Sequence, residues 1–86
     1  MKNKVYEYRT QKKITQSELS RLVNVSRQTI NSIERNKFNP TLVLAHKLSQ
    51  VFGVSIDEIF IFEEDENIDF TLMQSKEKEN TNDTIN

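Results

Sequence analysis

The chain has 86 residues, enough for one small domain, and a net charge of −1. It contains no cysteine and a single histidine, His46, which excludes disulfides, thiolate metal sites and a histidine pair. No apolar run approaches the roughly 20 residues of a membrane span and no signal-peptide pattern opens the chain, so we expect a cytoplasmic protein.

The charge is unevenly distributed along the chain. Residues 1–62 contain ten Lys or Arg and five Asp or Glu, a net charge of +5, whereas residues 63–86 contain two Lys and eight Asp or Glu, a net charge of −6. This shift predicts a domain over residues 1–62 and an acidic C-terminal extension over residues 63–86. Within the extension we predict a short dimerisation element at about residues 67–74 and disorder in the remainder.

Two helices are predicted in the first part of the domain. The first runs from about residue 3 to residue 12. A capping box opens the second, because Thr15 and Glu18 can each satisfy an exposed backbone amide of its first turn. Apolar residues recur at spacings of three and four, which predicts one buried stripe on each helix. The residues predicted to face inward are Val5, Tyr8, Arg9, Leu19, Leu22 and Val23.

A tight turn follows the second helix. Asn24 tolerates a positive φ, so it is predicted to end that helix in the left-handed conformation, and Ser26 is predicted to cap the third helix. In the third helix Ile30 and Ile33 face inward. Two helices joined by so short a connection cross steeply, which predicts a helix-turn-helix over about residues 15–35.

Two more helices complete the predicted domain. Thr41 caps the fourth, which ends at Gly53, and a second capping box formed by Ser55 and Glu58 opens a short fifth helix. The positions predicted to be apolar and inward-facing are Leu42, Leu44, Ala45, Leu48, Val51, Phe52, Ile59 and Phe60. In residues 68–73 apolar and polar side chains alternate, which favours a short strand.

The exposed face of the third helix carries side chains suited to reading DNA bases. Arg27 can donate two hydrogen bonds to guanine, and Gln28 or Asn31 can pair with adenine. Arg27 and Gln28 stand at the start of the helix, where a recognition helix contacts base edges, and Asn31 lies one turn later. An ordinary solvated polar face is the competing interpretation.

Phosphate contacts are predicted around the helix-turn-helix. Gln16 begins the second helix, where exposed amides and the helix dipole favour an anion. Arg35 and Lys37 follow the third helix, and the amides of Thr41 and Leu42 open the fourth. For each of these residues the alternative is a solvated surface position.

Two charged residues are predicted to lie on inner helix faces. Arg9 lies on the inner face of the first helix, and Glu34 continues the inner face of the third helix after Ile30 and Ile33. An unpaired buried charge is costly, so we predict that Arg9 and Glu34 form an ion pair that holds the first helix against the third. Independent solvation of the two charges is the alternative.

Catalytic chemistry is not predicted. His46 has no neighbouring cysteine or carboxylate, the serines and threonines serve as helix caps, and there is no glycine-rich phosphate loop. We therefore expect no enzyme activity, no metal site, no cofactor and no small-molecule ligand.

In order and spacing, these residues resemble the Xre family of Cro/cI-type helix-turn-helix regulators over residues 3–62. The resemblance is carried by Arg9, residues 14–19, residues 25–30, Ile33, Glu34, residues 39–42, Ala45 and residues 53–60. It implies an all-α fold, the compact five-helix lambda-repressor-like domain. The family usually has glycine at the positions of Lys13, Asn24 and Asn36, and Lys13 is expected to alter the first loop slightly.

The resemblance also implies roles for particular residues. It assigns base reading to four residues and phosphate contact to Gln16, which would also brace the base-reading residues. It further implies an internal salt bridge between Arg9 and Glu34. The base-reading positions are occupied by Arg27, Gln28, Asn31 and Ser32.

The predicted function is sequence-specific binding of double-stranded DNA by a transcriptional regulator, a repressor that occupies a palindromic operator as a homodimer. One short recognition helix reads few base pairs, which favours two copies on an inverted repeat. No membrane association is expected. The alternative is a protein-interaction module of a regulatory or toxin–antitoxin pair that uses the extension. In a third hypothesis the acidic extension covers the basic face and lowers DNA affinity.

Overall fold

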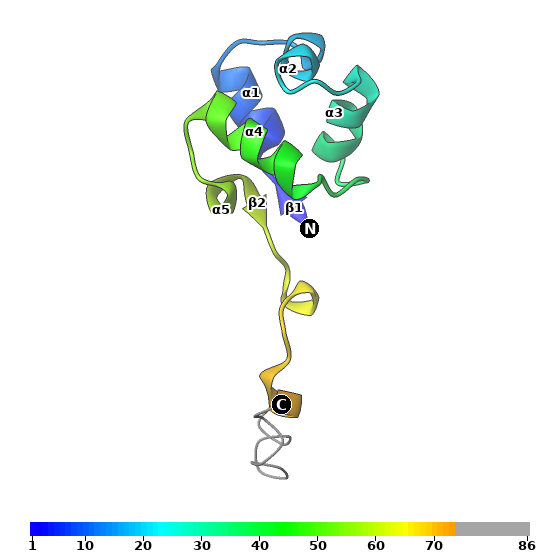
Figure 1. The fold of residues 1–86 in the computed structure, drawn as a ribbon, viewed down its shortest axis with the longest axis vertical. Helices are drawn as coiled ribbons and strands as arrows, with labels where there is room; N and C mark the ends of the chain where they lie inside the picture. The colour runs from blue at the N-terminus through cyan, green and yellow to red at the C-terminus, as the bar shows by residue number, and fades with distance from the viewer. Residues whose placement is uncertain (74–86) are drawn as a thin grey trace.

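The computed structural model of the chain describes residues 1–73, and Figure 1 shows its helices around a small interior. In chain order the elements are β1 (Lys2–Asn3), α1 (Val5–Gln11), α2 (Gln16–Leu22), α3 (Arg27–Glu34), α4 (Leu42–Phe52), α5 (Ile56–Ile59), β2 (Phe60–Ile61) and the 3₁₀ turn η1 (Glu64–Glu66). The predicted five-helix domain is confirmed. Within residues 1–73, no helix combines the length and apolar character that crossing a bilayer requires.

The core lies where the inner faces of the five α helices meet. The ring of Tyr8 on α1 stacks on that of Phe52 on α4, with 5.6 Å between ring centroids. The buried apolar residues are Val5, Leu19, Val23, Ile30, Ile33, Leu44, Ala45, Leu48, Phe52, Ile59 and Phe60. Most of the predicted inward positions are therefore correct.

Two predicted core residues are exposed instead. Leu22 is 61% exposed and Leu42 is 78% exposed. Successive residues of an α-helix are rotated by roughly 100°. The buried face of α2 includes Ser20, which turns that face away from Leu22. The buried face of α4 includes Leu44, which stands roughly 200° around the helix from Leu42.

A two-stranded antiparallel sheet, which was not predicted, joins the two ends of the domain. It pairs Lys2 with Ile61 and Asn3 with Phe60. Asn3 therefore lies in β1 rather than in the first helix. Its side chain accepts a hydrogen bond from the amide of Val5, the first residue of α1, at 3.1 Å. Phe60 is buried as predicted, but in β2 rather than in α5. Strands of two residues are too short to produce a sequence pattern.

Local polar contacts begin and end the helices as predicted. Both capping boxes are present: the Thr15 and Ser55 amides donate to Glu18 and Glu58 at 2.7 and 2.9 Å. The hydrogen bond from the Thr15 backbone lowers the pKa of the Glu18 carboxyl. The side chains of Ser26 and Thr41 cap α3 and α4.

Three residues other than glycine occupy the left-handed region. Asn24 and Asn36 end helices with φ of 58° and 60°, and Lys13 has φ of 58°. Lys13 therefore adopts the left-handed conformation that glycine readily takes. A left-handed residue with a Cβ costs roughly 1–2 kcal/mol unless its side chain is Asn or Asp, so Lys13 carries a local strain.

The described part of the extension leaves the domain after β2 and runs away from α2 and α3, so it does not cover α3 (Figure 1). The strand predicted for residues 68–73 is wrong, because residues 70–73 are helical. The Asp69 carboxylate accepts a hydrogen bond from the Thr71 amide at 3.0 Å, which favours a helical turn. The disorder predicted from residue 75 onward lies outside the described residues, as does residue 74 of the predicted dimerisation element.

We predict that Lys13→Gly raises the free energy of unfolding by about 0.5–1 kcal/mol, since relief of the left-handed strain exceeds the added entropy of an unfolded glycine. Urea unfolding followed by circular dichroism at 222 nm measures the change. Lys12→Gly is the matched control, because this substitution removes the same charge from a residue whose φ of −81° is not left-handed. An equal effect of both substitutions would contradict the assignment of strain to Lys13.

Candidate nucleic-acid interface

A buried small residue and a short turn set the relation between α2 and α3. Ser20 is 5% exposed, and its hydroxyl donates to the Ser17 carbonyl at 2.7 Å. The Ser20 carbonyl in turn accepts from the Val25 amide at 2.9 Å, which closes the turn around Asn24. With Val23 and Ile30 buried on either side, the two helices form the predicted helix-turn-helix.

The first turn of α3 presents polar side chains to solvent. The Ser26 hydroxyl accepts from the Thr29 amide at 3.1 Å, so the start of the helix is capped by its own side chain. Arg27 and Gln28 are exposed, whereas Asn31 and Ser32 are half-buried. The four side chains predicted to read bases thus divide into an exposed pair in the first turn of α3 and a pair held closer to the protein.

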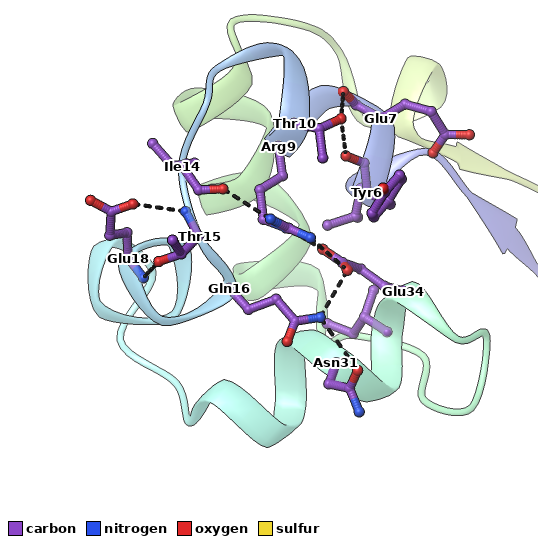
Figure 2. A network of polar contacts seen from close by, with 12 residues as sticks. Tyr6, Glu7, Arg9, Thr10, Ile14, Thr15, Gln16, Glu18, Asn31 and Glu34 are labelled. Atoms are coloured by element: carbon purple, nitrogen blue, oxygen red, sulfur yellow. Dashed lines mark hydrogen bonds and ion pairs between the residues drawn. The ribbon is translucent and has the colours of Figure 1, made fainter.

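A charged network lies behind these residues (Figure 2). The Arg9 Nε lies 2.6 Å from Glu34 Oε2, and a second guanidinium nitrogen lies 3.2 Å from Glu34 Oε1. Both side chains are largely buried, at 12% and 7% exposure. The hydrogen bond that Arg9 donates to Glu34 raises the pKa of the Arg9 guanidinium. Arg9 also donates to the Ile14 carbonyl at 2.9 Å, which ties the loop after α1 to the pair.

Gln16 connects this pair to the exposed face of α3. Its amide nitrogen donates to Glu34 Oε1 at 3.0 Å and to Asn31 Oδ1 at 3.3 Å (Figure 2). Gln16 therefore contacts α3 at two residues one turn apart. The resemblance implied a bracing Gln16, but the sequence contains no indication that Asn31 is the residue it contacts.

The residues predicted to contact phosphates lie around this face and are solvent-exposed, apart from the half-buried Gln16. Arg35 follows α3 directly, and the Lys37 amide donates to the Ser32 carbonyl at 2.8 Å. The Thr41 hydroxyl accepts from the Leu44 amide at 3.2 Å and so serves as the cap of α4.

One basic residue of this surface was missed. Lys13 lines a shallow pocket of about 480 Å³ together with Arg9, Thr15, Gln16 and Arg27. No periodicity or spacing places Lys13 beside Arg27, because the loop after α1 brings them together. Among residues 1–73 no three His, Cys, Asp or Glu side chains form a group that could hold a metal ion.

We predict that Glu34→Ala lowers the free energy of unfolding by about 3 kcal/mol, because it leaves the Arg9 charge buried without a partner. The double substitution Arg9→Met with Glu34→Met is expected to lose less than Glu34→Ala, since it removes both charges and restores apolar volume. Chemical denaturation of the variants measures both values. A loss for the double substitution as large as that for Glu34→Ala would contradict a buried, mutually dependent pair.

Comparisons with known proteins agree with this geometry. Residues 5–59 match the family model described as helix-turn-helix. A helix-turn-helix transcriptional regulator of Methanocaldococcus jannaschii is 50% identical over 66 residues, which are 77% of this chain and all of that protein. The regulator YgzD of Bacillus subtilis is 38% identical over 65 residues, which are 76% of this chain and 98% of that protein.

Solved structures show the same fold. The restriction-modification controller protein C.AhdI of Aeromonas hydrophila superposes with a TM-score of 0.60 at 30% identity, covering 65% of this chain and 85% of that one. The N-terminal DNA-binding domain of SinR from Bacillus subtilis gives 0.56 at 36% identity, with 60% and 77% covered. The chain therefore belongs to the helix-turn-helix family of DNA-binding transcriptional regulators, of the Xre and Cro/cI type.

Proposed function

We propose that the protein reads a specific sequence in double-stranded DNA by placing α3 in the major groove. Arg27 and Gln28 would contact base edges first, with Asn31 and Ser32 one turn behind. The observation that carries this proposal is the exposed polar first turn of α3, mounted on a helix whose opposite face is buried through Ile30 and Ile33. Arginine and the carboxamides have the donors and acceptors that base edges require.

The surrounding cations and helix ends would contact the DNA backbone. Gln16 stands at the start of α2, Arg35 and Lys37 follow α3, and Thr41 precedes α4. Such contacts supply affinity and fix the register of α3 without reading sequence. They would account for the net charge of +5 in the first 62 residues.

We further propose that two copies bind an inverted repeat and repress transcription from the promoter they cover. An eight-residue α3 reads only a few base pairs, so a second copy on the next turn of the duplex would supply the missing specificity. The described surface also exposes large apolar side chains that a second copy would cover. The most exposed of these on the domain are Leu22, Leu42 and Val43.

A second candidate function is binding of a protein partner through the extension. Ile68, Phe70, Leu72 and Met73 are each more than half exposed. An amphipathic segment of this kind can add to the groove or sheet edge of another protein. A protein with this function would bind DNA weakly, or its DNA binding would not depend on salt concentration.

Base reading and backbone contact are separated by two substitutions. We predict that Gln28→Ala relaxes specificity at one or two base positions, by roughly 1–3 kcal/mol each. Lys37→Ala is expected to weaken binding to all sequences alike and to reduce the salt slope by about one. The measurements are site selection from random DNA and titration over a range of salt concentrations.

Gln50→Ala is the matched control for Gln28→Ala, because Gln50 is also exposed but lies on α4. Equal losses on operator and random DNA for Gln28→Ala would disprove its base-reading role. Salt-insensitive binding by the unsubstituted protein, or none, would favour the protein-partner function.

The oligomer is tested by sedimentation of the protein on its selected DNA. We predict two copies on the full operator, with half-sites about 34–36 Å apart on one face of the duplex. The same stoichiometry for residues 1–62 would place the interface in the domain, whereas loss of the second copy would place it in the extension. One copy per operator for the full chain would rule out the homodimer.

A further inference from the structure

The orientation of the Asn31 side chain is determined by the charged network behind it. We propose that Asn31 presents its amide nitrogen to the major groove and therefore selects guanine over adenine at its base position. Gln16 is the positioning residue for this choice. The inference rests on the proposed function and specifies which base is preferred by one of the four residues proposed to read DNA.

The ion pair between Arg9 and Glu34 determines how the Gln16 side-chain amide is oriented. The Arg9 guanidinium has only donors and the ionised Glu34 carboxylate has only acceptors. Glu34 Oε1 lies 3.0 Å from the Gln16 side chain, so Gln16 must turn its amide nitrogen toward Glu34. The reverse orientation would place the Gln16 oxygen against a carboxylate oxygen. The orientation of the Gln16 amide is thus determined by the charge of Glu34.

The orientation of Gln16 in turn determines that of the Asn31 side-chain amide. The amide nitrogen of Gln16 has a second hydrogen, and the Asn31 side chain lies 3.3 Å from it. Only an oxygen can accept there, so Asn31 must turn Oδ1 toward Gln16. Figure 2 shows the Asn31 nitrogen on the opposite side, directed away from Gln16. Asn31 is half-buried, so this nitrogen is the part of its amide best placed to face outward.

This orientation changes the expected readout. Bidentate pairing of asparagine with adenine needs Oδ1 and Nδ2 directed at the same base edge, one to accept from N6 and the other to donate to N7. With Oδ1 held toward Gln16, only the donor is presented. Guanine offers two major-groove acceptors, N7 and O6, whereas adenine offers N7 beside a donor. Asn31 would therefore favour guanine, and its predicted pairing with adenine is replaced.

Site selection with the full-length protein and its variants tests the inference. The position whose preference disappears in Asn31→Ala identifies the base read by Asn31. In the unsubstituted protein we expect guanine over adenine there by roughly tenfold, within the range of a good base contact. Gln16→Met frees the Asn31 amide to rotate, so we expect that ratio to fall below about twofold or to favour adenine.

Two further variants separate orientation from general loss of affinity. Asn31→Asp can still accept from Gln16 but presents an oxygen outward, so we expect its preference to move to cytosine, whose N4 donates. Arg35→Met is the control for Gln16→Met, since losing one proposed phosphate contact is expected to weaken all sequences without moving any base preference. Cooperative thermal unfolding of each variant shows that the fold is retained.

The outcomes distinguish this inference from the function on which it rests. An adenine preference at the Asn31 position, or a guanine preference that survives Gln16→Met unchanged, would overturn the inference. If Asn31→Ala changes no position while Gln28→Ala does, the inference fails and the base-reading function stands. If neither substitution changes any position, the proposed function fails as well.

Discussion

The contact between Arg9 and Glu34 is the interaction on which the candidate nucleic-acid interface depends. It joins α1 to α3 at two nitrogen–oxygen contacts, and both side chains are largely buried. Removing such charges from water is costly, so the pair is stable only while both partners and their remaining hydrogen bonds are in place. Arg9 satisfies that need through the Ile14 carbonyl and Glu34 through Gln16. Side chains of α1 and α2 thus meet α3 at a single carboxylate, and Arg9 connects the loop after α1 to it.

This network lies between two different faces of α3. On one side Ile30 and Ile33 are buried in the apolar core, and on the other Arg27 and Gln28 extend freely into solvent. Asn31 lies between them, and its side chain accepts a hydrogen bond from Gln16 on α2. A helix held on its buried face and exposing polar side chains in its first turn suits the proposed contact with DNA bases. The network therefore connects the stability of the domain to its recognition chemistry.

Features that depend on a few neighbouring residues could be predicted from the sequence. The capping boxes at Thr15 and Ser55 and the left-handed turns at Asn24 and Asn36 each involve residues within four positions. Their chemistry is the same in any fold, so composition and spacing are sufficient to place the helix ends. The helix-turn-helix and most of the core follow from these ends and from the apolar periodicity. The pairing of Arg9 with Glu34 could also be predicted from the sequence. Both residues were expected on inner helix faces, and a buried charge without a partner is costly.

Other features were decided only by tertiary structure, because they depend on which distant segments meet. Periodicity alone placed Leu22 and Leu42 in the core, but the packing of α2 and α4 turns both toward solvent. The strand that holds Asn3 exists because Phe60 returns beside it from the far end of the domain. The orientation of Asn31 likewise depends on Gln16 from another helix. The sequence by itself determined the helices, the turn and the polar face of α3. The orientation of the Asn31 amide on that face depends on contacts between residues 15 to 25 positions apart, because each hydrogen bond fixes which group donates and which accepts at the next one.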